Sequence, residues 1–164
     1  MATPRPTKAT EEMKREVARA ICADLVEEGM YQQSEASDRE AELAAVLMTR
    51  VDGYALARQL DDKYGWAICF SVIEVLEECR TMLDAAIIDA QRIWVKEEGI
   101  EPDLISGQSV VLRSGETGVI DQVSSYRPAC YEVKIDGDAD AEGPLRSRRL
   151  CRFEEVEVAP TPTL

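Results

Sequence analysis

The stretch Gly107-Gln-Ser-Val-Val-Leu-Arg-Ser-Gly115-Glu-Thr-Gly118-Val-Ile120 decides the fold of this chain. Its paired apolar residues and spaced glycines predict two short strands that meet at a tight turn. Before this stretch, apolar residues recur every three or four positions, which is the spacing of amphipathic helices. The sequence therefore predicts an α+β protein, with an N-terminal helical domain over residues 10–100 and a small β-barrel over residues 107–158.

The rest of the C-terminal part continues the strand pattern. Strands are expected at about 109–113, 117–123, 129–135 and 146–152, with a fifth at 155–158. Gly99 and Pro102 end the helical pattern, so residues 101–106 are predicted to be a linker. The proline-containing ends, residues 1–9 and 159–164, are expected to be a disordered arm and tail.

The N-terminal part carries signals for the beginnings and ends of helices. A first helix is expected to begin after Thr10 and to stop at Gly29. Ser37-Asp-Arg-Glu40 and Ser71-Val-Ile-Glu74 have the spacing of capping boxes, so each predicts a helix start. Between them, Asp52-Gly53 is expected to interrupt or restart the helical pattern, which Gly65 ends.

Composition restricts the classes of function. The chain has 164 residues and a formal net charge of −13, so it repels free nucleic acid and anionic membranes. It contains no histidine, which removes the commonest general base and the commonest imidazole metal ligand. We see neither a signal peptide nor a membrane span, and we expect a cytoplasmic protein, possibly acting in a host's cytoplasm.

The cysteines and the acidic loop are the remaining candidates for chemistry. Five cysteines are widely spread without a Cys-x-x-Cys motif, so we interpret them as reduced core residues. The carboxylates of residues 136–142 superficially resemble a calcium loop, but Ala141 and Ser147 stand where that motif needs glycine and glutamate. We therefore expect no enzyme activity, no cofactor and no metal.

The C-terminal segment resembles a known class of small barrels. The glycine-rich run from Gly107 to Val123, the strand Tyr131–Ile135 and the closing segment Arg149–Val156 resemble SH3-like barrels of the KOW and Tudor kind. Members of this class bind RNA, DNA or protein segments and do not catalyse reactions. The resemblance implies a binding role for the barrel and does not extend to residues 1–100.

We therefore expect a non-enzymatic interaction or regulatory protein that docks on a larger protein, of the kind that phages or mobile elements encode as accessories or inhibitors. A homodimer is a further possibility. Tyrosine and arginine are enriched at binding hot spots. The expected docking surface on the barrel consists of Tyr126, Arg127, Tyr131, Arg146 and Arg148.

Three alternatives remain open. Arg146, Arg148, Arg149 and Arg152 could bind phosphate in a KOW-like, nucleic-acid-associated protein, or they could form surface ion pairs with neighbouring acids. The acidic excess could instead imitate nucleic acid and occupy a basic groove on another protein. In that case the partner would bind an acidic helical surface made of Asp61, Asp62, Glu74, Glu77 and Glu78.

Overall fold

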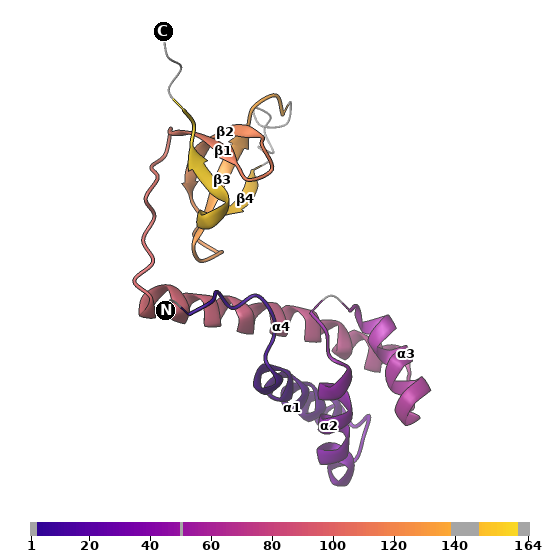
Figure 1. Ribbon diagram of the computed structural model, residues 1–164. Coiled ribbons are helices and arrows are strands. Elements are labelled where there is room, and N and C mark those ends of the chain that lie inside the picture. The colour runs from indigo at the N-terminus through magenta and orange to yellow at the C-terminus, as the bar shows by residue number, and fades with distance from the viewer. Residues whose placement is uncertain (1–2, 50, 139–147, 161–164) are drawn as a thin grey trace. The chain divides into compact units, whose positions relative to one another are not determined.

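The computed structural model describes residues 3–49, 51–138 and 148–160 (Figure 1). Four α-helices precede a five-stranded antiparallel sheet within these ranges, so the predicted α+β class is confirmed. The chain divides into two compact units, one formed by Pro4–Ala90 and the other by Thr3 with the residues from Gln91 onward. This division falls inside the fourth helix and not in the expected linker at 101–106.

The helices are α1 (Glu11–Glu27), α2 (Ala36–Val46), α3 (Gly53–Tyr64) and α4 (Phe70–Glu97). Helix α1 begins after Thr10 as expected, and Thr10 caps it, because its Oγ1 accepts a hydrogen bond of 3.2 Å from the backbone N–H of Met13. The predicted stop is also confirmed, since Gly29 has a φ of 73° and the next N–H bonds back to Leu25. Helices with such glycine ends cannot extend further without strain.

The two predicted capping boxes are wrong. Helix α2 begins at Ala36, after a short 3₁₀ helix at Gln33–Glu35, so Ser37 lies inside the helix. Helix α4 begins at Phe70, and its first backbone bond joins the N–H of Ile73 to the carbonyl of Cys69. Ser71 is consequently the second residue of α4 and not its cap.

Helices α1, α2 and α3 gather on one side of α4 (Figure 1). Their apolar faces form a core that contains Ile21, Leu43, Leu60 and Leu83, all without exposed surface. Gly53 lets α3 begin directly against α4, because a Cβ atom there would lie 2.7 Å from the carbonyl oxygen of Ile73. The close contact fixes where α3 meets the second turn of α4.

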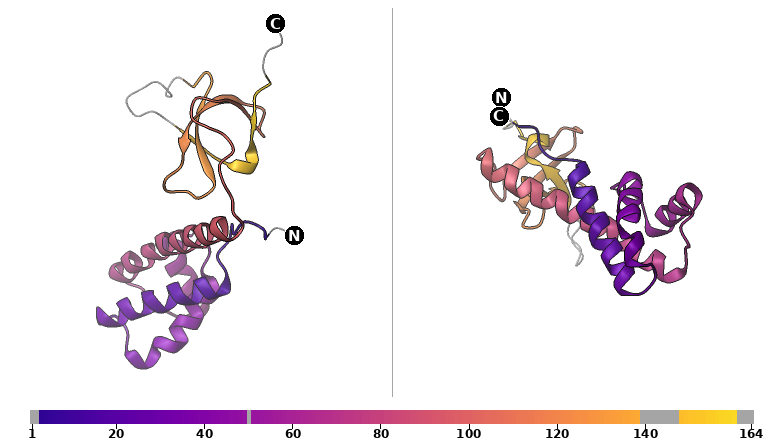
Figure 2. Two further views of the ribbon diagram at one scale, coloured as in Figure 1. Left: turned by 90° about the vertical axis from the view of Figure 1, so that its left-hand side faces the viewer. Right: turned by 90° about the horizontal axis from the view of Figure 1, so that it is seen from below.

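The sheet is built from β1 (Ser109–Leu112), β2 (Thr117–Val123), β3 (Cys130–Ile135), β4 (Arg149–Arg152) and β5 (Val156–Val158). The five strands lie within the expected ranges, although β4 begins at Arg149 and positions 146–147 of its expected range lie outside the described residues. All pairs are antiparallel, in the order β4-β3-β2-β1-β5, and a 3₁₀ helix at Phe153–Glu155 separates β4 from β5. The sheet curls around its own core (Figure 2), which includes Val110, Ile120, Tyr131 and Val133.

The segments expected to be unstructured make specific contacts. In the expected linker, Leu104 is buried in the core of the sheet, and the Ser106 hydroxyl donates to the carbonyl of Asp121. In the expected arm, the backbone of Thr3 bonds to the side chains of Trp94 and Glu98. Residues 103–106 thus belong to the second unit, although they contain neither helix nor strand.

Candidate functional site

Three arginines of the sheet-containing unit, which we call the β-unit, are held in ion pairs: Arg148, Arg149 and Arg152. Arg148 Nε lies 2.7 Å from one carboxylate oxygen of Asp121, and Lys134 Nζ lies 2.9 Å from the other. The hydrogen bond from Arg148, followed by that from Lys134, lowers the pKa of Asp121. Arg149 pairs with Glu116, and Arg152 lies 3.9 Å from Glu155. Each of these three arginines is therefore paired with a carboxylate of the same unit.

The structure separates the five residues expected to form the docking surface on the barrel. Tyr131 has no exposed surface, and its hydroxyl donates to Asp103 and accepts from the backbone N–H of Leu104, so it cannot contact a partner. The Arg148 side chain is 11% exposed. Tyr126 is 55% exposed, and Arg127 lies next to it in the β2–β3 loop. Arg146 lies outside the described residues.

The strand register places Tyr131 inside the sheet and not at the surface where the sequence predicts it. Tyr131 lies opposite Cys151 on β4 and Val123 on β2, and its ring packs against Phe153 at a centroid distance of 4.3 Å. It therefore belongs to the inner face of the sheet. A tyrosine in a half-buried strand fits either face, so only the pairing decides which one it occupies.

The described side chains do not gather into a candidate metal site. No group of three or more potential metal ligands occurs within residues 3–49, 51–138 and 148–160. Burial raises the pKa of both Cys22 and Cys79 to about 12, which keeps these thiols protonated and unreactive. Of the acidic loop, Asp136 and Asp138 are described, whereas residues 139–147 lie outside the described part.

A second surface lies on the helical unit, and we call it the acidic-aromatic face. Phe70, Glu74 and Glu77 follow one another on successive turns of α4, with Glu78 beside them, and all four are exposed. We include Tyr54 of α3 because it follows Gly53, where an added Cβ atom would lie 2.8 Å from Cγ of Glu77. Tyr54 and Phe70 are 65% and 73% exposed. The acidic-aromatic face consists of Tyr54, Phe70, Glu74, Glu77 and Glu78.

The structure brings together only part of the predicted acidic surface. Asp61 and Asp62 are exposed but lie two turns farther along α3, and Asp62 is 3.8 Å from Arg58. Tyr54 and Phe70 were not among the predicted site residues. The helical spacing of Phe70, Glu74 and Glu77 is the signal that could have identified this face.

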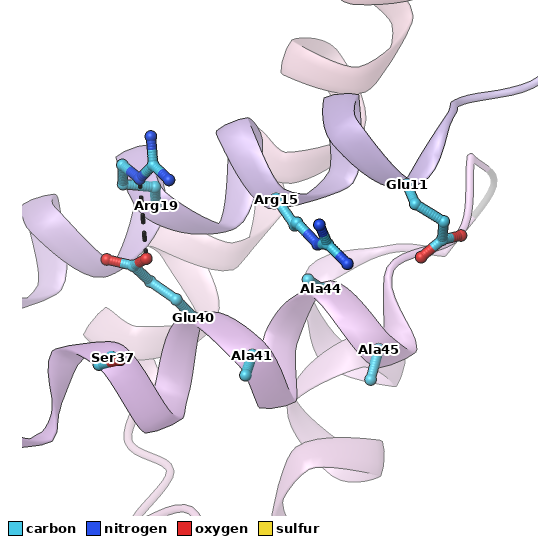
Figure 3. A pocket seen from close by; sticks show the side chains of 8 residues that line it. All are labelled: Glu11, Arg15, Arg19, Ser37, Glu40, Ala41, Ala44 and Ala45. Atoms are coloured by element: carbon cyan, nitrogen blue, oxygen red, sulfur yellow. Dashed lines mark ion pairs between the residues drawn. The ribbon is translucent and has the colours of Figure 1, made fainter.

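A hollow of about 340 Å³ lies between α1 and α2 (Figure 3). Arg15 and Arg19 line it from α1, and small side chains of α2 form its floor. Arg19 Nε lies 3.8 Å from Glu40 across the hollow. Its two arginines are balanced by Glu11 and Glu40, so the lining favours neither an anionic nor a cationic ligand.

Comparisons with known proteins do not assign this chain to a family: no protein-family model, no curated protein and no solved structure matches it. None of the described helices has the length and apolar composition needed to cross a membrane. The surface chemistry of the two units is therefore the basis for a functional proposal.

Proposed function

We propose that this chain is a non-enzymatic interaction protein that docks on a larger protein through its acidic-aromatic face. The observation that carries the proposal is the exposure of Phe70 on the same face of α4 as Glu74 and Glu77, with Tyr54 exposed at the start of α3. Aromatic side chains bury large apolar areas at interface centres, and surrounding charges select the partner. Three neighbouring carboxylates favour a basic partner surface.

The β-unit has a different place in this proposal. We propose that it belongs with SH3-like barrels, a view supported by the four consecutive antiparallel strands, the 3₁₀ helix and the return of β5 to β1. Arg148, Arg149 and Arg152 already have carboxylate partners, which weakens the phosphate-binding alternative. An origin in a phage or mobile element remains part of the proposal without a structural test.

The proposal can be tested by capture on the immobilised full-length chain from a lysate, with and without nuclease. Tyr54→Ala with Phe70→Ala, or the triple change Glu74→Gln, Glu77→Gln and Glu78→Gln, should abolish capture of a protein partner. A matched control removes three exposed carboxylates from α1 by Glu12→Gln, Glu16→Gln and Glu27→Gln, and should preserve capture.

Three other results would redirect the proposal. Capture that disappears after nuclease treatment would favour the nucleic-acid-associated alternative. Displacement of the captured protein by added DNA would indicate that the acidic-aromatic face imitates nucleic acid. Equal capture by the wild type and by both groups of variants would show that this face is not the docking surface.

A further inference from the structure

Strand β4 has a neighbouring strand on only one side within the described residues. It ends the sheet order, and its partner is β3. A strand at the edge of a sheet presents backbone donors and acceptors that can pair with another extended chain. The accessible groups of β4 can be identified from the register of the β3–β4 pair.

The register directs the backbone of Leu150 away from β3. The N–H of Phe153 bonds to the carbonyl of Ala129, which makes these two residues a hydrogen-bonded pair. Hydrogen-bonded and non-hydrogen-bonded pairs alternate along antiparallel strands, so Leu150 and Glu132 form a non-hydrogen-bonded pair. In such a pair, the N–H and the C=O of Leu150 both point away from β3. Arg152 has the same orientation, and its N–H is bonded by the carboxylate of Glu155 at 3.1 Å.

A hollow of about 380 Å³ lies along this outward edge. It is bounded by Arg149 and Leu150 of β4, by Leu112 and Arg113 at the end of β1, and by Glu155. The Leu150 side chain is 38% exposed. The edge thus combines free main-chain groups with room for a side chain of an added strand.

Charge selects what can occupy this edge. Arg113 is exposed and pairs with no carboxylate in the described part of the chain. The carboxylate of Glu155 is already engaged by the backbone and side chain of Arg152. The available charge therefore favours an acidic strand.

We propose that the β4 edge binds an extended acidic segment of a protein partner by strand addition. The backbone of Leu150 supplies the main-chain hydrogen bonds, and Arg113 attracts a carboxylate of the segment. This surface is separate from the acidic-aromatic face and goes beyond the proposed function. It would give one chain two docking surfaces of opposite charge preference.

The test is an NMR titration of the ¹⁵N-labelled full-length chain at physiological salt. The probe is a capped decapeptide of alternating glutamate and valine, and the control peptide alternates lysine and valine. Saturable shifts centred on the amides of Leu150 and Arg113, with the glutamate peptide alone, are the expected result. Absence of shifts at millimolar peptide, or shifts confined to other elements, would overturn the proposal.

Two variants separate main-chain pairing from side-chain contact. Leu150→Pro removes the outward N–H without removing a hydrogen bond to β3. It should lower the affinity for the glutamate peptide about tenfold. Leu150→Ala keeps that N–H and should lower the affinity for the glutamate peptide less. If Leu150→Pro shifts the amide signals of β3, the test depends on Arg113→Glu instead. That variant should abolish binding of the glutamate peptide. Unchanged affinity in Arg113→Glu would contradict the proposal. The variants of the acidic-aromatic face should bind the glutamate peptide as the wild type does.

Discussion

At the scale of single residues, burial separates the five cysteines by reactivity. Cys69 is exposed, whereas the other four are buried, and burial raises the pKa of Cys22 and Cys79 to about 12. Because the thiolate is the reactive form, iodoacetamide at about pH 8 should label only Cys69 in the native chain. Mass spectrometry should find almost no label after Cys69→Ser. Rapid native labelling of Cys22 or Cys79 would show that the helical core opens readily.

Asp121 links local charge to the pH dependence of stability. Its pKa in the folded protein is lowered from the usual value of 3.8, first by the hydrogen bond from Arg148 and then by Lys134. Such a carboxylate stabilises the fold above its unfolded pKa, and the contribution is lost as the pH falls through the folded pKa. Asp121→Asn should therefore lower the urea midpoint at pH 6, and the difference from wild type should disappear toward pH 2. A difference that stays constant with pH would exclude this ion pair as its cause.

At the scale of elements, helix ends could be predicted better than helix starts. Gly29, Gly65 and Gly99 end their helices with φ between 63° and 73°, a conformation that other residues adopt only with strain. Ser37 and Ser71 have the sequence spacing of caps but lie inside helices. A capping box is a local preference worth about 1 kcal/mol, and the packing of α2 and α4 into the core can override it.

The caps can be compared directly by mutation. Asp52 accepts a hydrogen bond of 2.7 Å from the N–H of Ala55 and caps α3, so Asp52→Ala should lower the free energy of unfolding by about 1 kcal/mol. Ser71→Ala should change it by less than about 0.5 kcal/mol, because Ser71 is an exposed residue within α4. Chemical denaturation of both variants gives the comparison. A larger loss for Ser71→Ala would make Ser71 the cap and place the start of α4 two residues later, at Val72.

At the scale of the whole molecule, the strands and the helical core followed from sequence pattern, whereas the surface did not. Alternation and turn residues predicted the five strands, although β4 is described only from Arg149. The pairing of Arg148 with Asp121 joins residues 27 positions apart, so it depends on the strand register and not on local sequence. The acidic-aromatic face likewise requires Gly53 to bring α3 against α4. Such contacts decide which charges remain available to a partner. They cannot be predicted from the periodicity of the sequence, because they join residues that are far apart along the chain.

The two units have separate cores, and this separation predicts how the chain responds to damage. The helical core draws on residues up to Leu83, whereas the core of the sheet begins at Leu104. Leu83→Ala leaves a cavity in the first core and should cost about 2–5 kcal/mol there. Val133→Ala removes buried apolar volume from the second core.

Hydrogen exchange measured on the full-length chain should therefore resolve two independent responses. Leu83→Ala should accelerate exchange in α1, α2 and α3 and leave β1, β2 and β3 unchanged, because no buried residue is shared between the two cores. Val133→Ala should show the reverse pattern. If either substitution accelerated exchange in both units to the same extent, the chain would unfold as one cooperative body, and the mutational effects of the two docking surfaces could not be separated.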